Sequence, residues 1–175
     1  LKRTHKATVK ERILHQAIFS VMNKIYEPTI ISESYSCRIN KETHKGMKRV
    51  VEMIRTVSKN NTHPCYALKC DIKKFFDSID HCVLISILNE RIKDEKVRSL
   101  LSEVIGSFEA GRANLFEPKG VPIGNLTSQI FANIYMDRFD QFVKHTLKVK
   151  NYARYTDDFV IVSDPDISGK TLFIA

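Results

Sequence analysis

The sequence predicts an α+β fold in which helices pack on one face of an antiparallel sheet. Two observations support this prediction. Stretches with helical spacing of apolar residues occur together with short β-forming segments. At residues 152–163, strand-forming residues flank two adjacent carboxylates, Asp157 and Asp158, a pattern typical of a tight β-hairpin with the acidic pair at its turn.

The first 64 residues are expected to form a mostly helical, basic domain. Apolar residues recur at helical spacing over residues 8–25, and Pro28 ends this helix. A loop or short strand follows, and a second helix is expected over Thr43–Val57. The polar cluster 60–64, closed by a proline, indicates the boundary with a second domain at residues 65–175.

The second domain is expected to begin with a strand at Tyr66–Ile72, where apolar and polar residues alternate. Asp80 is a candidate N-cap for the helix that follows it. The remaining expected elements, in chain order, are a helix at about Asp94–Ile105, a partly extended connection at Gly111–Gly120, a long helix from Asn125 to about His145, and the hairpin.

The composition is that of an ordinary globular chain. The chain is 43% hydrophobic and 27% charged. Its length of 175 residues is enough for one sizeable core or two small lobes. The apolar runs are too short to span a membrane, so no membrane partner is expected. The four cysteines have no CxxC spacing, and we interpret them as small core residues of a protein in a reducing, cytoplasmic compartment.

The net charge of +8 is concentrated in the first domain. Residues 1–64 hold 13 Lys and Arg against 5 Asp and Glu, whereas residues 65–175 hold 15 of each. This asymmetry favours a basic lobe that contacts phosphates. A solvated, lysine-rich surface is the alternative, and charge alone does not separate the two.

Three carboxylates are candidate metal ligands. Asp71 ends its expected strand and lies 86 positions before Asp157, so that a strand end and a neighbouring hairpin can converge on one point. Three such carboxylates can hold two Mg²⁺ ions, which prefer oxygen ligands. Two ions roughly 3.5–4 Å apart can clamp the attacking and leaving oxygens of a phosphoryl transfer. Alone, a carboxylate such as Asp71 is more often a turn or cap residue.

Three further features have both a functional and a structural interpretation. The segment from Gly120 to Gln129 turns sharply into a helix with small residues at spacings of four, which either admits a bulky ligand or, more commonly, allows tight helix packing. Phe76 either lines a nucleotide pocket or packs in the core. Arg38 and Lys41 lie in an expected loop and either bind phosphate or are ordinary surface charges.

Taken together and in this order, these segments resemble the reverse transcriptases. Asp71 with Phe76 resembles the first catalytic motif of the palm, Gly120-x-Pro122-x-Gly124-x-x-x-Ser128 resembles the motif that faces template and nucleotide, and Tyr155-Thr156-Asp157-Asp158 resembles the Tyr-x-Asp-Asp box. The resemblance implies a right-hand polymerase with fingers at 1–64, a palm at 65–175 and the thumb absent. It also implies a fragment of a longer protein, cut after the hairpin.

The resemblance implies a role for each matched residue. Asp71, Asp157 and Asp158 would be catalytic and, together with Ile72, would hold two Mg²⁺ ions, with Mn²⁺ as a substitute. The residues implied in nucleotide binding are Phe76, as a gate against the ribose 2′-hydroxyl, Arg38, Lys41, Ile123 and Gly124. Those implied in binding template or primer are Tyr155, Ser128, Gln129 and Pro122. The implied partners are template RNA, a DNA or RNA primer and deoxynucleoside triphosphates.

The middle motif narrows the resemblance. Ile123 and Gln129 stand where most of the family has Gln and Pro, and this variant resembles the reverse transcriptases of diversity-generating retroelements, which copy a template RNA with errors at adenines and are accompanied by a basic accessory protein. A hydrophobic Ile123 would hold the incoming nucleotide less strictly than a glutamine. The alternatives are a group II intron-type enzyme and a derived nucleic-acid-binding or phage-defence module without templated synthesis.

Overall fold

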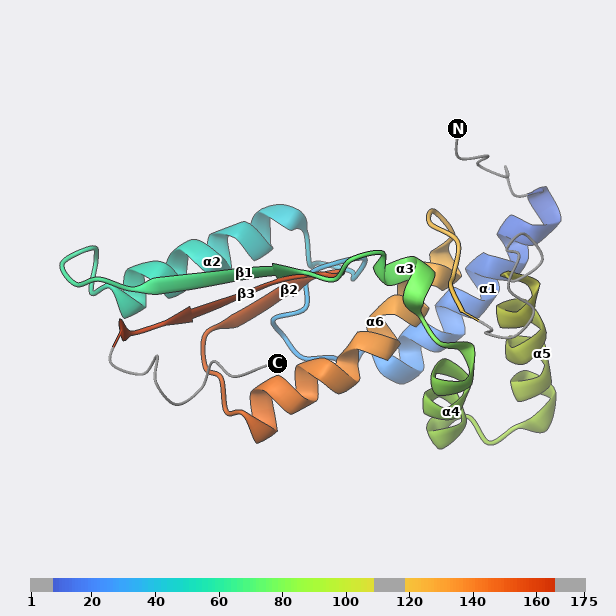
Figure 1. Ribbon diagram of the computed structural model, residues 1–175. Helices are drawn as coiled ribbons and strands as arrows, with labels where there is room; N and C mark the ends of the chain where they lie inside the picture. Colours follow the sequence, from blue (N-terminus) through green and yellow to red (C-terminus); the bar gives the residue numbers. More distant parts are fainter. Residues whose placement is uncertain (1–7, 109–118, 166–175) are drawn as a thin grey trace. The chain divides into compact units, whose positions relative to one another are not determined.

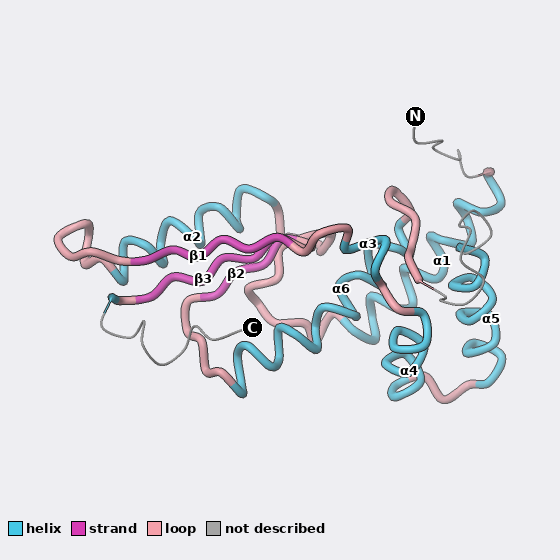
Figure 2. The backbone as a smooth tube through the Cα atoms, viewed as in Figure 1, coloured by secondary structure: helices cyan, strands magenta, loops and turns pink. Residues whose placement is uncertain are grey.

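The computed structural model describes residues 8–108 and 119–165, which form two compact units (Figure 1, Figure 2). Unit 1 comprises Leu1–Thr29 and Phe76–Tyr135, and unit 2 comprises Ile30–Phe75 and Met136–Ala175. Each unit therefore combines two segments that are distant in sequence. These boundaries differ from the expected division at residue 64, and the assignment of 1–64 to fingers and 65–175 to palm stays a prediction.

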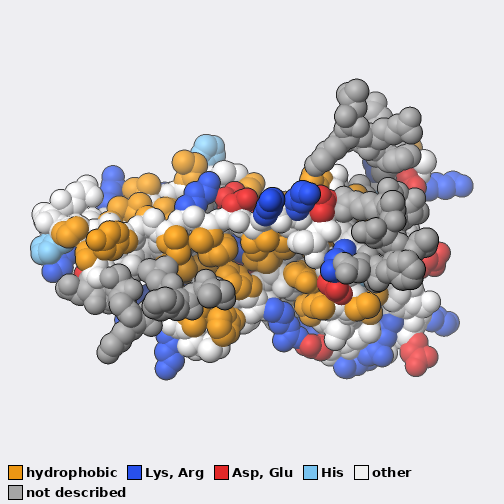
Figure 3. All heavy atoms as spheres, viewed as in Figure 1, with side chains coloured by type: hydrophobic (Ala, Val, Ile, Leu, Met, Phe, Trp, Pro, Cys, Tyr) orange, Lys and Arg blue, Asp and Glu red, His pale blue; other side chains and the backbone are white. Residues whose placement is uncertain are grey.

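The described residues of unit 2 contain an antiparallel sheet of three strands in the order β1-β3-β2. The strands are β1 (Tyr66–Asp71), β2 (Tyr152–Tyr155) and β3 (Asp158–Ser163). Asp71 lies opposite Asp158 in the register of β1 and β3. None of the residues of the outer strand β1 is buried, and hydrophobic side chains reach the surface along the sheet (Figure 3).

One face of the sheet is covered by α2 (Thr43–Val57), in agreement with the expected helix. Met53 of α2 packs with Tyr35, Ala153 and Val162 in a buried cluster. Ala153 and Val162 belong to β2 and β3, so the apolar side of α2 rests directly on these strands. The helix is positioned by burial of this side, as expected for an amphipathic helix.

Helical segments also cover the other face, which corrects the expectation of helices on one face only. Val143 of the π-helix η2 (Phe142–Thr146) packs with Tyr152, Phe159 and Ile161, and Phe139 from the end of α6 (Leu126–Gln141) joins this cluster. The ring of Phe139 lies 5.1 Å from that of Phe159. The sheet of unit 2 is therefore a middle layer between two helical layers.

Three helices of unit 1 begin at residues whose side chains cap them. Their bounds are α1 (Val9–Tyr26), α4 (His81–Arg91) and α5 (Glu95–Gly106). Thr8 accepts a hydrogen bond from the Glu11 amide, and the Glu11 carboxylate accepts one from the Thr8 amide, which forms a capping box. Asp80 accepts from the Val83 amide, as predicted. The Tyr26 hydroxyl donates to the Leu88 carbonyl at 3.2 Å and ties α1 to α4.

The expected elements are confirmed with small changes at their ends. The long helix ends at Gln141 and continues as η2, and the hairpin occurs where it was predicted. The short helix α3 (Phe75–Ser78) was not predicted, because four residues are too few to show a helical repeat. The expected connection at Gly111–Gly120 lies mostly outside the described residues.

The structure also bears on two expectations that were drawn from the composition. The four cysteines, all within the described ranges, are free, but Cys37 and Cys82 are exposed, so the interpretation as core residues is wrong for these two. Among the described helices, none is long and apolar enough to cross a membrane.

Two methionines of α2 offer a test of this packing. Met53 is 1% exposed and Met47 is 65% exposed. We expect Met53→Ala to lower the free energy of unfolding by about 2–5 kcal/mol, because it leaves a cavity against the sheet. Met47→Ala should change it by less than about 0.5 kcal/mol. Urea denaturation measures both, and equal effects would contradict the placement of α2.

Candidate metal centre

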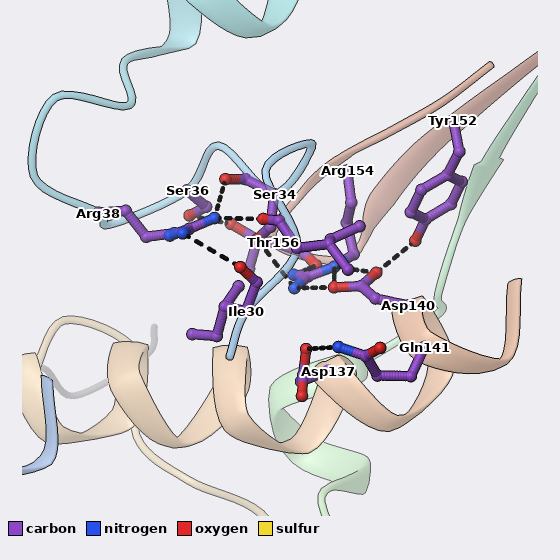
Figure 4. A network of polar contacts seen from close by, with 11 residues as sticks. Ile30, Ser34, Ser36, Arg38, Asp137, Asp140, Gln141, Tyr152, Arg154 and Thr156 are labelled. Carbon is purple, nitrogen blue, oxygen red and sulfur yellow. Dashed lines mark hydrogen bonds and ion pairs between the residues drawn. The ribbon is translucent and has the colours of Figure 1, made fainter. Parts of the chain in front are cut away.

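The acidic pair lies at a two-residue turn between β2 and β3. Tyr155 pairs with Asp158, so only Thr156 and Asp157 lie between the strands. Thr156 has a φ of 59°, a left-handed conformation that tight hairpins need but that a β-branched residue rarely adopts. Its hydroxyl lies 2.6 Å from that of Ser36, and its carbonyl accepts a hydrogen bond from Arg154 at 2.7 Å (Figure 4). These contacts hold the unusual turn.

The structure brings together the three carboxylates that the sequence singled out. Asp71 and Asp158 are directly paired residues of β1 and β3, so their side chains share one face of the sheet. One carboxylate oxygen from each of Asp71, Asp157 and Asp158 lies within 4.8 Å of the others. None of the three is buried, so a ligand has access to the cluster.

The chemistry of this donor set fits a hard divalent cation. All three side chains offer oxygen atoms, the ligands that Mg²⁺ and Mn²⁺ prefer, and three ligands leave coordination positions open. The resemblance also implied Ile72 as a residue that holds the metal, and this role stays a prediction. Its carbonyl accepts a hydrogen bond from the Phe75 amide at 3.2 Å, and its side chain packs against the cluster around Tyr152.

The cluster is electrostatically unfavourable without a cation. Partial burial raises the pKa of Asp157 above its usual range, and the charges of Asp71 and Asp158 raise this pKa further. A divalent cation would offset both effects, because it replaces lost hydration and neutralises the repulsion.

Lys69 is a member of this site that the sequence analysis did not single out. It lies two residues before Asp71 on β1, and alternate residues of a strand share a face. Its Nζ atom is 3.3 Å from Oδ1 of Asp158. Two-residue spacing from a candidate ligand was the available signal. The lysine thus gives the cluster a positive neighbour.

Arg38 and Lys41 are engaged within the loop that connects α1 to α2. Arg38 donates to the Ser34 carbonyl at 2.8 Å, and Lys41 donates to the Ser32 carbonyl at 2.7 Å. The ammonium of Lys41 also lies 5.4 Å from the centre of the Tyr35 ring. Both cations stabilise this loop, and their contact with a triphosphate stays a prediction.

Tyr155 connects the hairpin to the start of α2. Its side chain is exposed, and its hydroxyl accepts a hydrogen bond from Thr43 at 3.1 Å. Thr43 is the first residue of α2, so the tyrosine ring is oriented from outside the sheet. Support of a primer end by Tyr155 stays a prediction.

The remaining predicted residues belong to unit 1, and their roles stay predictions. Ile123 is exposed, Gly124 has a φ of 107° in the turn before α6, and Ser128 is completely buried. Burial of Ser128 favours the packing interpretation of the small residues. The carbonyl of Phe76 accepts a hydrogen bond from the Val121 amide at 2.8 Å, which ties α3 to the segment that contains Pro122, and Gln129 lies in the first turn of α6.

A family model and curated relatives match the sequence. The model described as "Reverse transcriptase (RNA-dependent DNA polymerase)" matches residues 3–170. The group II intron-encoded protein LtrA of Lactococcus lactis subsp. cremoris is 29% identical over 147 residues, which cover 82% of this chain and 23% of that protein. An uncharacterised 91 kDa protein in the cob intron of Schizosaccharomyces pombe is 26% identical, over 78% of this chain and 16% of that protein. The chain therefore spans less than a quarter of either relative.

The fold is similar to part of a solved telomerase. The telomerase of Candida albicans, in complex with a fragment of telomeric RNA, superposes with a TM-score of 0.56 at 17% identity. The match covers 91% of this chain and 31% of that one. At this identity the similarity concerns the fold, an α+β arrangement with a small antiparallel sheet.

Removal of Lys69 tests its effect on the cluster. We expect Lys69→Ala to tighten Mn²⁺ binding by about two- to fivefold, because an exposed ion pair contributes about 0–1 kcal/mol and its cation competes with the metal. Lys48→Ala on α2 removes the same charge from another exposed position of unit 2 and serves as the control. Isothermal titration measures both affinities, and weaker binding by Lys69→Ala would contradict the prediction.

The raised pKa of Asp157 predicts a pH-dependent stability of the metal-free protein. A carboxyl whose folded pKa exceeds its unfolded value destabilises the fold at neutral pH, and this penalty is lost as the pH falls below the unfolded pKa. Asp157→Asn should therefore raise the unfolding midpoint at pH 7 in the presence of a chelator, and the difference should shrink toward pH 4. Thermal denaturation measures it, with the exposed Glu103→Gln as control. A lower midpoint at pH 7 would refute the argument.

Proposed function

The chain belongs to the reverse transcriptase (RNA-dependent DNA polymerase) family, and on this premise we propose that it adds deoxynucleotides to a primer 3′-hydroxyl under the direction of an RNA template. The observation that carries the proposal is the close approach of the carboxylates of Asp71, Asp157 and Asp158, which all lie within the segment that the family model matches. Three carboxylates at one point have a clear use in phosphoryl transfer and little use in folding, because their mutual repulsion is unfavourable.

The carboxylates act by holding and orienting the reacting groups. Bound Mg²⁺, or Mn²⁺ in its place, supplies charge neutralisation and Lewis-acid activation. Asp71 and Asp158 project from two paired strands and Asp157 from the adjoining turn, so the three ligands are held by the sheet. The primer 3′-hydroxyl attacks the α-phosphate of the incoming nucleotide, and pyrophosphate leaves. Positioning and electrostatic stabilisation therefore account for most of the catalysis.

Other residues are proposed to contact the substrates. Tyr155, exposed and next to the turn, supports the primer end. Phe76 excludes the ribose 2′-hydroxyl, and the exposed Ile123 contacts the nucleotide with Gly124. Arg38 and Lys41 are proposed for the triphosphate, which requires them to exchange their loop contacts for phosphate oxygens. Pro122, Ser128 and Gln129 shape the surface toward the template, with Ser128 contributing through packing.

Two biological roles are supported by different observations. The middle motif, with Ile123 and Gln129, favours error-prone copying in a diversity-generating retroelement with a basic accessory protein. The intron-encoded relatives favour a group II intron-type enzyme. The two roles differ in fidelity opposite adenine, so the copied sequence separates them. A nucleic-acid-binding or defence module that does not copy its template is the alternative from another class.

Primer extension on an adenine-rich RNA template with Mg²⁺ tests the proposal. We expect Asp157→Asn to reduce the rate of extension by at least about 100-fold, because the loss of a metal ligand removes several kcal/mol of transition-state stabilisation. Glu103→Gln, which neutralises an exposed carboxylate on α5, should leave the rate unchanged.

The sequenced products separate the roles. Errors concentrated opposite adenine support the diversity-generating role, and faithful copies support the intron-type role. Extension that Asp157→Asn leaves intact would refute the assignment of the metal centre. If no variant extends the primer although RNA binds in a salt-sensitive manner, the module that does not copy its template is the better explanation.

A further inference from the structure

The Arg154–Asp140 pair is a fully buried ion pair on the face of the sheet opposite to the paired carboxylates. Both side chains are 0% exposed, and Nη2 of Arg154 lies 2.7 Å from Oδ2 of Asp140. Nε of Arg154 donates to Oδ1 at 2.8 Å, so the guanidinium grips the carboxylate with two parallel hydrogen bonds. Asp140 lies in the last turn of α6, and Arg154 lies on β2.

The guanidinium also holds the turn that carries the acidic pair. Nη1 of Arg154 donates to the carbonyl of Thr156 at 2.7 Å, and Nη2 donates to the hydroxyl of Ser34 at 3.0 Å (Figure 4). Thr156 is in turn 2.6 Å from the hydroxyl of Ser36. One side chain therefore links the helix end, the turn and the loop before α2.

Tyr152 completes the environment of the carboxylate. Its hydroxyl donates to Oδ1 of Asp140 at 2.6 Å. Burial raises the pKa of Tyr152, and the negative charge of Asp140 raises it further, so the hydroxyl remains a donor at neutral pH. The Asp140 carboxylate thus receives hydrogen bonds on both oxygens, which is what a buried charge requires.

We propose that Arg154 and Asp140 are positioning residues of the metal centre, which hold the Thr156–Asp157 turn so that the Asp157 and Asp158 carboxylates face Asp71. The inference rests on the proposed metal-dependent function. It assigns to two residues outside the carboxylate cluster a role in metal affinity, exerted through the main chain of the turn. Outer contacts that orient metal ligands commonly change metal affinity by about 10–100-fold.

The geometry explains why the turn needs such a support. Thr156 is held at a positive φ, and the cluster beside it consists of three like charges. Both features favour relaxation of the turn away from this arrangement. The paired hydrogen bonds from the Arg154 guanidinium to Asp140 oppose relaxation of the turn. A planar guanidinium with fixed donors cannot follow the turn without breaking these bonds.

Three variants separate positioning from folding. Arg154→Lys keeps the buried charge but loses the paired guanidinium donors and with them the hydrogen bond to the Thr156 carbonyl. The triple variant Arg154→Met, Asp140→Leu, Tyr152→Phe removes both charges and the hydroxyl that would remain unpaired, and such replacements of a buried ion pair are commonly tolerated by the fold. Tyr152→Phe alone keeps the hydrogen bonds of Arg154 to Asp140, Ser34 and the Thr156 carbonyl, and is the matched control.

Two measurements are made on each variant, after circular dichroism has confirmed that it is folded. The first is Mn²⁺ affinity, which should fall by about 10–100-fold in Arg154→Lys and in the triple variant, and by less than about twofold in Tyr152→Phe. The second is amide hydrogen exchange of the metal-free protein. Exchange at residues 155–159 should accelerate by about tenfold or more in the first two variants, while exchange in α2 stays unchanged.

The outcomes distinguish the inference from the function on which it rests. Wild-type Mn²⁺ affinity and unchanged exchange at residues 155–159 in folded Arg154→Lys would overturn the inference, since the pair would then be structural only. If the triple variant does not fold, Arg154→Lys decides. If the wild-type chain does not bind Mn²⁺, the proposed function fails, and the exchange measurement, which needs no metal, still decides whether the pair orders the turn.

Discussion

The register between β1 and β3 is the constraint on which both the core and the site of unit 2 depend. It places Asp71 opposite Asp158 and Cys70 opposite Phe159. Alternate residues of a strand point to opposite faces, so a shift of one residue would move Asp71 to the side of the Phe159 cluster and Cys70 to the side of α2. Cys70 and Ile72 pack against the cluster around Tyr152 and Phe159, and such a shift would remove them from it. The packing of these two side chains therefore also specifies where Asp71 and Asp158 meet.

Two ion pairs of unit 2 differ in their surroundings, and this difference suits them to different tasks. Arg154 and Asp140 are 0% exposed, and breaking such a buried pair costs about 3–5 kcal/mol, because one charge remains uncompensated. The Lys69 and Asp158 side chains are 72% and 44% exposed, and exposed pairs contribute only about 0–1 kcal/mol. The first pair is a permanent part of the structure. The second pair can separate at little cost, which frees Asp158 for a metal ion and Lys69 for a phosphate.

The sequence predicted the elements that have a periodic or alternating pattern of apolar residues. It did not predict the features that depend on tertiary packing. The bounds of α2, the cap at Asp80 and the hairpin follow from local patterns that the structure confirms. The second helical layer was missed, because α6 has apolar residues around its whole circumference and gives no sign of which side meets the sheet. The sequence analysis did not single out Arg154. A charge in the middle of a buried strand requires a partner, and that requirement was the available signal.

The candidate metal centre combines an unfavourable carboxylate cluster with a turn that its surroundings hold in place. Thr156 at a positive φ costs about 1–3 kcal/mol, and the raised pKa of Asp157 shows that its charged form is disfavoured where it stands. Such a turn persists only where its surroundings determine it more strongly than its own preferences. Here Ser36, Arg154 and the paired strands do so from three sides. The carboxylates can then remain close together before a cation arrives, so that binding requires little rearrangement of the ligands.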